Sequence, residues 1–117
     1  MTDTIISPES AKIAALNDAF RTTFSGGRVV ITRGVRDMRR PAEAFRIVRN
    51  FTGFTEDNDP NGEHDFGAFD LDGERLFWKI SYYDSASFGS GRDMGSEDPS
   101  DPEQTARVMT VMLASEY

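Results

Sequence analysis

Apolar residues recur at helical spacing near the N-terminus of the 117-residue chain. Over residues 7–24, isoleucine, leucine and phenylalanine lie three or four positions apart, which predicts an amphipathic helix. Ser7 is a favourable N-cap, Pro8 fits the first helical turn, and the glycine pair after residue 25 predicts the end of the helix. A second helix is predicted from Pro41 to about Asn50, again with proline in the first turn. The apolar stripe of each helix indicates a face that packs into a core.

A β-hairpin is the clearest prediction from the pattern. Residues 66–71 and 74–83 alternate apolar and polar positions and flank an Asp-Gly dipeptide suited to a type I′ turn. This two-residue turn fixes the register, so that Gly67 lies opposite Trp78 and leaves space for its indole. The face predicted to be buried holds Phe69, Leu71, Leu76, Trp78, Ile80 and Tyr82. The second face carries Phe66, Phe77 and Tyr83, which a helix or a partner would have to cover.

Two further segments complete the predicted fold. Residues 28–35 are rich in β-branched side chains and predict a strand. Residues 101–113 begin with Asp-Pro-Glu-Gln, typical of a helix start, and continue with an apolar stripe, so a last helix is predicted. The loop of residues 85–100 is long for a compact domain. The order α-β-α-β-β-α predicts an α+β fold, a two-layer sandwich of three helices on a three-stranded, largely antiparallel sheet.

Length and composition restrict the classes of protein. The chain fits a single domain over residues 1–117, with residues 1–6 expected to be flexible. The absence of cysteine excludes disulfides, a thiolate metal site and a cysteine nucleophile. No apolar run approaches the roughly 18 residues that a membrane span requires. The N-terminus lacks the basic-then-apolar pattern of a secretory signal, so the cytoplasm is the expected location.

The net charge of −7 hides an uneven distribution. Residues 28–49 contain seven arginines against two acidic residues, a net charge of +5, whereas residues 50–106 contain 14 acidic residues against three basic ones, a net charge of −11. An acidic surface attracts basic partners and repels nucleic acid. We therefore expect a basic protein surface as partner and no direct binding of nucleic acid.

The densest polar cluster lies in residues 55–67 and contains the only histidine, His64. Carboxylates of this cluster and of the later acidic loop are the candidate partner-binding groups: Glu56, Asp57, Asp59, Glu63, Asp65, Glu97 and Asp98. The simplest interpretation of any single residue here is structural, because aspartate and asparagine side chains shape turns by bonding nearby backbone amides.

A metal-binding loop is an alternative interpretation of the same cluster. Acidic or amide side chains at alternate positions before a glycine are typical of the first half of a calcium loop. The twelfth position counted from Asp57 is Ala68, however, where that loop needs a bidentate glutamate. The remaining metal hypothesis is a lone divalent cation, with Asp57, Asp59, Asn61 and Glu63 as candidate ligands. No other cofactor is expected.

Acid–base chemistry is a second alternative, because His64 can titrate near neutral pH and act as a general acid or base. Neighbouring residues on a strand point in opposite directions, so His64 and Asp65 are not expected to meet. No serine stands in a Gly-x-Ser-x-Gly elbow that would supply a nucleophile.

Several stretches resemble a family of short bacterial proteins classed only as a domain of unknown function. They are residues 31–35 (ITRGV), 54–67 (FTEDNDPNGEHDFG), 78–84 (WKISYYD), 95–102 (GSEDPSDP) and 112–117 (MLASEY). The resemblance extends from Lys12 onward and implies no assigned activity or catalytic residue. Members of that family often lie among plasmid and other mobile-element genes, which implies an accessory role such as countering host defence. They often carry an aromatic residue at the position of Asn61, which weakens the calcium-loop interpretation.

The leading hypothesis is a small acidic, non-enzymatic interaction protein. Its acidic side would comprise the 56–65 loop, the hairpin acids Asp70, Asp72 and Glu74, and the 93–103 loop. It would bind a nucleic-acid-binding complex as a mobile-element-encoded inhibitor of host defence that mimics nucleic acid. The alternative is a metal-dependent or His64-assisted hydrolase-like enzyme that uses the acidic loop. A third hypothesis is a homodimer formed across the second hairpin face.

Overall fold

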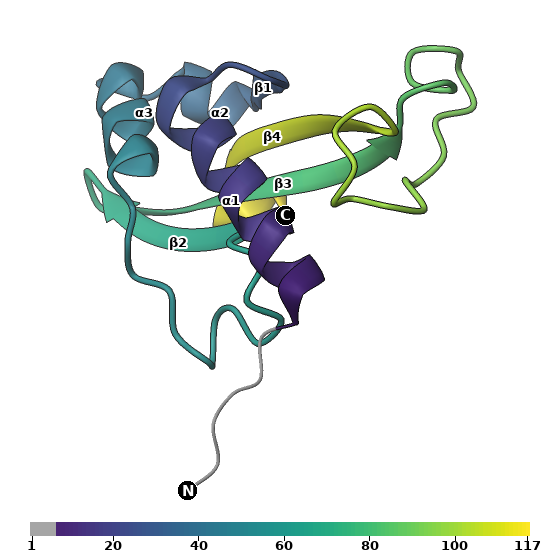
Figure 1. The fold of residues 1–117 in the computed structure, drawn as a ribbon. Helices are drawn as coiled ribbons and strands as arrows, with labels where there is room; N and C mark the ends of the chain where they lie inside the picture. The colour runs from purple at the N-terminus through teal and green to yellow at the C-terminus, as the bar shows by residue number, and fades with distance from the viewer. Residues whose placement is uncertain (1–6) are drawn as a thin grey trace, which may run out of the picture.

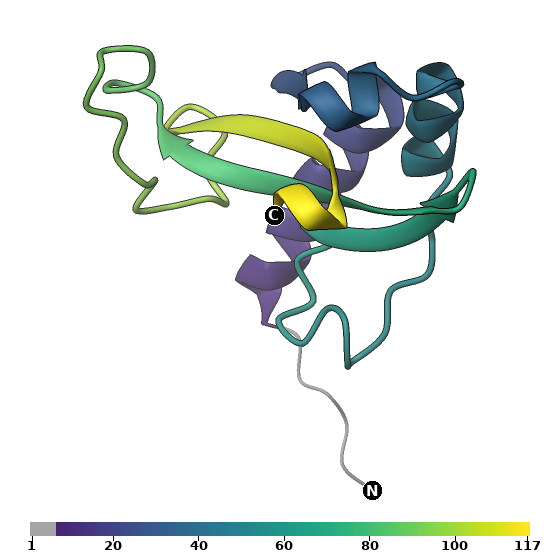
Figure 2. The same cartoon turned by 180° about the vertical axis from the view of Figure 1, so that it is seen from behind.

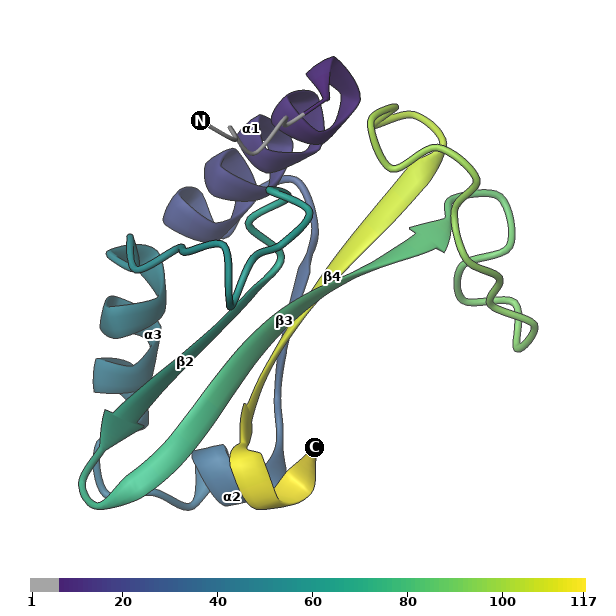
Figure 3. The ribbon, with the colours of Figure 1, turned by 90° about the horizontal axis from the view of Figure 1, so that it is seen from below.

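A mixed four-stranded sheet organises the chain, with three helices packed on one of its faces (Figures 1 and 3). The computed structural model describes residues 7–117, so the expectation for residues 1–6 lies outside the described part. The elements are α1 (Pro8–Thr23), β1 (Arg28–Ile31), α2 (Arg33–Arg36), α3 (Pro41–Arg49), β2 (Phe66–Leu71), β3 (Glu74–Asp84), β4 (Thr105–Leu113) and the short 3-10 helix η1 (Ala114–Glu116). The strand order is β1-β4-β3-β2, with β1 parallel to β4 and the other pairs antiparallel.

The two long helices agree with the sequence prediction. The Ser7 side chain accepts a hydrogen bond from the backbone N–H of Ser10, as an N-cap should, and α1 ends at Phe24 in a left-handed conformation. In α3, Ala44 and Val48 are fully buried. None of the helices described in residues 7–117 has the length and hydropathy of a transmembrane span.

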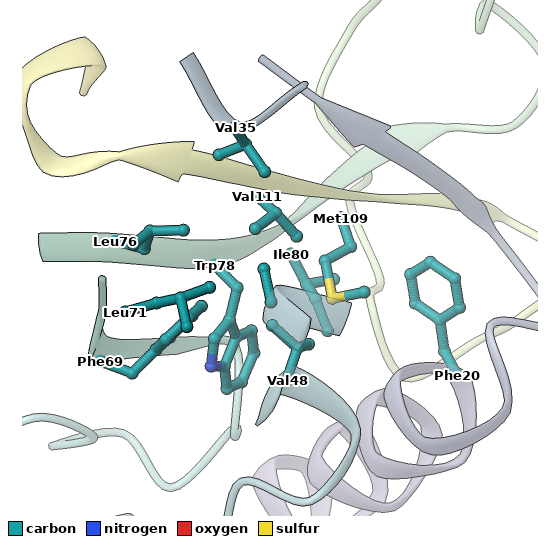
Figure 4. Close-up of a cluster of buried hydrophobic side chains, with 11 residues drawn as sticks. Phe20, Val35, Val48, Phe69, Leu71, Leu76, Trp78, Ile80, Met109 and Val111 are labelled. Atoms are coloured by element: carbon teal, nitrogen blue, oxygen red, sulfur yellow. The ribbon is translucent and has the colours of Figure 1, made fainter. Parts of the chain in front are cut away.

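The hairpin is confirmed in position and register. Asp72 and Gly73 both have positive φ angles, as a type I′ turn requires, and Gly67 pairs with Trp78. The predicted inner face lies in the core, where Leu76, Trp78 and Ile80 are almost completely buried (Figure 4).

The last predicted helix is wrong, because residues 105–113 form β4, an interior strand between β1 and β3. The sheet therefore has four strands instead of three. Asp101 does accept hydrogen bonds from the backbone of Glu103 and the side chain of Gln104, but it does so in a turn that leads into the strand. Pairing on both edges satisfies the backbone of β4, while Met109 and Val111 fill the core.

The strand predicted over residues 28–35 is shorter, since β1 ends at Ile31 and α2 follows. Gly34 lies in α2 against the C-terminal segment, where an added Cβ would come within 2.5 Å of the Leu113 side chain. This close approach places Val35 fully inside the core.

The second hairpin face is partly covered by the chain itself. The Tyr117 ring packs on Phe66 at 6.4 Å and on Phe77 at 5.6 Å between centroids, and Phe88 packs on Tyr83 at 5.4 Å. Figure 2 shows η1 on this side of the sheet, whereas α1 and α3 lie on the opposite side. The homodimer hypothesis stays a prediction.

Candidate functional site

The acidic loop folds around the inward-pointing carboxylate of Asp59, which is 9% exposed. This carboxylate accepts hydrogen bonds from the backbone N–H groups of Glu63 (3.1 Å) and His64 (3.2 Å). His64 itself adopts a left-handed conformation with φ 55°. Asp59 therefore closes the turn that brings His64 against helix α1.

The His64 imidazole lies between two carboxylates. Its Nδ1 is 3.0 Å from both carboxylate oxygens of Asp18 on α1, and its Nε2 is 3.7 Å from Asp59 Oδ2. The ring stacks on Phe54 with centroids 3.9 Å apart. Within residues 7–117, the polar side-chain partners of His64 are carboxylates and include no hydroxyl. The contacts with Asp18 and Phe54 fasten the acidic loop to α1.

Arg21 fixes Asp18 from the other side. This arginine is only 3% exposed and donates to Asp18 Oδ1 (3.0 Å) and to the backbone carbonyls of Val48 (2.8 Å) and Phe51 (3.0 Å). A buried arginine is stabilised when acceptors surround it. Arg21 thus ties α1 to the end of α3 and to the segment that leads into the acidic loop.

A second, deeper network connects the two acidic loops. Asn17 is fully buried; its Nδ2 donates to the Glu63 carbonyl (2.9 Å) and the Tyr82 hydroxyl (2.8 Å), and its Oδ1 accepts from Arg107 Nε (2.8 Å). Tyr82 donates to Glu63 Oε1 at 2.9 Å. Arg107 also donates to the Pro99 carbonyl in the 93–103 loop. One asparagine on α1 therefore joins both loops to the sheet.

Burial shapes the charges of this network. Desolvation raises the pKa of the Tyr82 hydroxyl above its ordinary value, so the hydroxyl stays protonated and donates to Glu63. Desolvation also lowers the pKa of Arg107, while Tyr82 and Glu63 oppose that shift. Because arginine ionises far above neutral pH, Arg107 remains a cation at pH 7.

The predicted partner-binding residues fall into two groups. Asp57 and Glu97 are exposed, as is Glu103, an additional carboxylate at the end of the 93–103 loop. By contrast, Asp59 and Glu63 are engaged in the internal bonds described above, and Asp98 accepts from the backbone and the hydroxyl of Ser100. Glu56 is exposed but already has an interaction partner. Asp65 is half-buried.

The hairpin acids occupy a different surface from the two loops. Asp72 forms an ion pair with Arg40 at 2.8 Å, and Asp70 forms one with Arg75 at 3.3 Å. The turn and the 85–104 loop lie at opposite ends of β3 (Figure 3). The 56–65 loop precedes β2 at the end remote from the turn. The molecule thus has an acidic end, formed by the 56–65 and 93–103 loops beside α1, and a basic end at α2 and α3.

The proposed metal ligands do not converge. Asp59 points at backbone amides and Glu63 at Tyr82, whereas Asp57 and Asn61 are exposed. Within the described residues, no group of three or more histidine, aspartate or glutamate side chains is arranged to hold a metal ion. The metal hypothesis stays a prediction with its own test below.

Sequence reasoning missed the residues that fasten the loops: Asn17, Asp18, Arg21, Tyr82 and Arg107. One signal was present, since Asn17 and Arg21 continue the buried stripe of α1 from Ile13 at four-residue steps. Polar residues within an apolar stripe indicate buried hydrogen-bonding partners.

Asp65 gives a prediction for the pH dependence of stability. Desolvation, followed by repulsion from Glu63, raises the pKa of this carboxyl in the folded protein. The ionised carboxylate therefore destabilises the fold at neutral pH, and this destabilisation is relieved as the pH falls through the raised pKa. Asp65→Asn should raise the melting temperature at pH 7, with a gain that shrinks at acidic pH.

Asp57→Asn is the control for this prediction, because it removes the same charge from an exposed position and should change stability little at either pH. A melting temperature of Asp65→Asn that is unchanged or lower at pH 7 would show that the carboxylate is needed in its charged form.

These features define a small α+β protein whose two acidic loops are joined by a buried polar network. The chain belongs to the family described as "Protein of unknown function (DUF3768)", whose sequence model matches residues 31–116. No curated protein and no solved structure matches the chain.

Proposed function

We propose that this protein is a non-enzymatic interaction protein whose acidic end binds a basic groove on a partner. In the specific form of this proposal, the partner is a nucleic-acid-binding complex of a host defence system, and the carboxylates take the place of phosphates. The observation that carries the proposal is the placement of exposed carboxylates on both loops beside α1, away from the arginines of α2 and α3.

The buried network supports this proposal because it pre-organises the acidic end. Asn17 and Arg107 bond to both loops, so the loops need little further ordering when a partner binds. A pre-organised surface avoids much of the entropy loss that weakens binding by mobile loops. Complementary charge also speeds association and selects basic surfaces over acidic ones.

The test is a comparison of two charge variants in a pull-down from a nuclease-treated bacterial lysate. The acidic-end variant is Asp57→Asn/Glu97→Gln/Glu103→Gln, which neutralises three exposed carboxylates. We expect the wild-type protein to retain a stoichiometric partner and this variant to bind it about 10- to 100-fold more weakly, since rim charges contribute steering and modest affinity each.

The matched control is Asp37→Asn/Asp70→Asn/Glu74→Gln, which removes the same charge from exposed sites near the basic end. It should retain the partner with unchanged affinity. Equal loss of binding by both variants would show that only the net charge of the protein matters. Retention of the partner by both variants would show that the acidic end is not part of the interface.

The enzyme alternative is tested with divalent cations. An ion that binds only the folded state must raise the melting temperature as its concentration rises. We expect calcium, magnesium, manganese and zinc to leave the melting temperature unchanged, because the candidate ligands Asp59 and Glu63 are already hydrogen-bonded. A saturable increase with any of them, lost in Asp57→Asn/Asn61→Ala, would favour the metal-dependent alternative.

A further inference from the structure

A groove lies at the basic end, between α3, the C-terminal end of α1 and strand β1. These three elements lie close together on the upper side of Figure 1. The Phe24 and Phe45 rings meet edge to face at 5.6 Å between centroids and form an apolar wall. The groove has a volume of about 560 Å³ and is lined by Phe24, Val29, Ala42, Phe45, Arg46 and Arg49.

Strand β1 adjoins this groove and has an open edge. It pairs with β4 on one side, and within residues 7–117 no strand pairs with its other side. The Thr32 N–H donates to the Val111 carbonyl at 3.1 Å. Because backbone groups alternate along a strand, the N–H and C=O groups of Val29 and Ile31 point away from β4. Unpaired backbone groups of this kind can accept an additional strand.

The open edge and the groove belong to one surface. The Val29 side chain lines the groove, while its backbone faces the open edge. In an added strand, every second side chain would point to the same face of the sheet as Val29, and therefore into the groove. Val30, whose side chain points to the opposite face, pairs with Thr110 of β4 and is 39% exposed, and no strand within residues 7–117 lies on its other side.

The rim of the groove carries unneutralised positive charge. Arg49 lies over the Phe24 ring with its guanidinium carbon 4.4 Å from the centroid, and it forms no ion pair within residues 7–117. Arg46 is paired with Glu43 at 2.9 and 3.0 Å but remains 63% exposed. An arginine beside an apolar wall is suited to a carboxylate that follows or precedes an apolar side chain.

We propose that β1 and this groove bind an extended acidic–apolar peptide segment of a partner protein. The segment pairs with the backbone of Val29 and Ile31, packs an apolar side chain against Phe24 and Phe45, and places a carboxylate at Arg49. This is strand addition to a sheet edge, in which backbone bonds supply affinity and side-chain pockets supply specificity. The site lies at the basic end and is independent of the function proposed for the acidic end.

The aromatic rings of the groove suit a peptide better than a single-stranded nucleic acid. Single-stranded nucleic acids bind through bases stacked on open aromatic faces. Here Phe24 and Phe45 contact each other, and Arg49 covers the Phe24 face. The open backbone edge also offers donors and acceptors that match another peptide strand.

The test pans a displayed library of random heptapeptides against the full chain and measures the enriched peptide by fluorescence anisotropy. We expect enrichment of sequences that combine apolar β-branched residues with aspartate or glutamate. Arg49→Glu should weaken binding of the enriched peptide by about tenfold or more, because it reverses the charge at the carboxylate site. Val29→Pro, which removes one outward N–H from the edge, should weaken it similarly.

Arg33→Glu is the matched control, since it makes the same charge change at an exposed position of α2 outside the groove and should leave the affinity unchanged. Circular dichroism checks that each variant is folded, and Arg49→Glu decides the test if Val29→Pro does not fold. Three results would overturn the proposal: no enriched peptide, a peptide whose affinity Arg49→Glu leaves unchanged, or binding of a short single-stranded DNA at this groove without any peptide.

Discussion

Asn17→Ala is expected to lower the free energy of unfolding by about 3 kcal/mol, because it removes three hydrogen bonds and leaves buried partners unsatisfied. Asn17 is fully buried and bonds to Glu63, Tyr82 and Arg107. Tyr82 keeps its bond to Glu63, but the Nε of Arg107 and the Glu63 carbonyl each lose the partner that Asn17 provides. For a chain of this length the change corresponds to a melting temperature lower by about 12 °C.

The same substitution should loosen both acidic loops. Hydrogen exchange of the Glu63 and His64 amides is expected to accelerate relative to that of the core strands, since these amides depend on a turn that Asn17 fastens to α1. Asn50→Ala is the control: Asn50 is exposed, and in the described part of the chain its side chain donates only to the Arg46 carbonyl of its own helix. A loss below about 1 kcal/mol for Asn17→Ala would contradict the central role of this residue, because surface substitutions already span about half that value.

Gly67→Ala is the second substitution expected to have a large effect, with a loss of about 3 kcal/mol from overpacking. An added Cβ would lie 2.3 Å from Trp78 Nε1 and 2.9 Å from Phe51 Cζ. Trp78 is completely buried and cannot withdraw without displacing the core around it. Chemical denaturation of the purified variant measures the loss directly.

A double variant separates this clash from other effects of the substitution. Trp78 Nε1 has no hydrogen-bond partner among residues 7–117, so Trp78→Phe removes volume without breaking a described hydrogen bond. In the Trp78→Phe background, Gly67→Ala should be markedly less destabilising, which is a favourable coupling between the two sites. Gly53→Ala is the control, since its Cβ would be 3.5 Å from the nearest atom, an ordinary contact. If the losses in unfolding free energy of the two single variants simply add in the double variant, the clash between the added Cβ at Gly67 and the Trp78 ring is refuted.

The hairpin was predictable because its determinants are local. The Asp72-Gly73 turn fixes the pairing, and the alternation of the two strands decides which face is buried. Strand β4 was mispredicted for the opposite reason. As an interior strand it carries apolar residues on both faces, among them Val108, Met109 and Met112, and this run matches a helical stripe as well as a strand. Pairing with the neighbouring strands β1 and β3 makes this segment a strand and not a helix.

The polar network was not predictable from spacing, because its members come from distant parts of the chain. Asn17 and Arg107 are 90 positions apart, and Asp18 and His64 are 46 positions apart. The sequence predicts the acidic loop as the candidate interaction segment, yet Asp59 and Glu63 turn inward and only part of the predicted surface is exposed. The density of carboxylates indicates where the segment lies, whereas tertiary contacts decide which of them reach solvent.

The two proposals place recognition on separate surfaces of opposite charge, the acidic end and the β1 groove. Their separation makes the two proposals distinguishable. Arg49→Glu should not affect the partner of the acidic end, and the variant Asp57→Asn/Glu97→Gln/Glu103→Gln should not affect the peptide bound at β1. A variant that abolished both activities while remaining folded would indicate a single shared interface instead.

The salt dependence of the dissociation constant tests whether exposed carboxylates bind a basic partner in place of nucleic acid. The measurement titrates the captured partner with this protein at low and high salt, with and without a short competing duplex DNA. We expect the affinity to fall steeply with salt, because exposed charges are screened, and DNA and this protein to exclude each other from the partner. An affinity that is unchanged between low and high salt, with DNA bound at the same time, would overturn the proposed mimicry of nucleic acid.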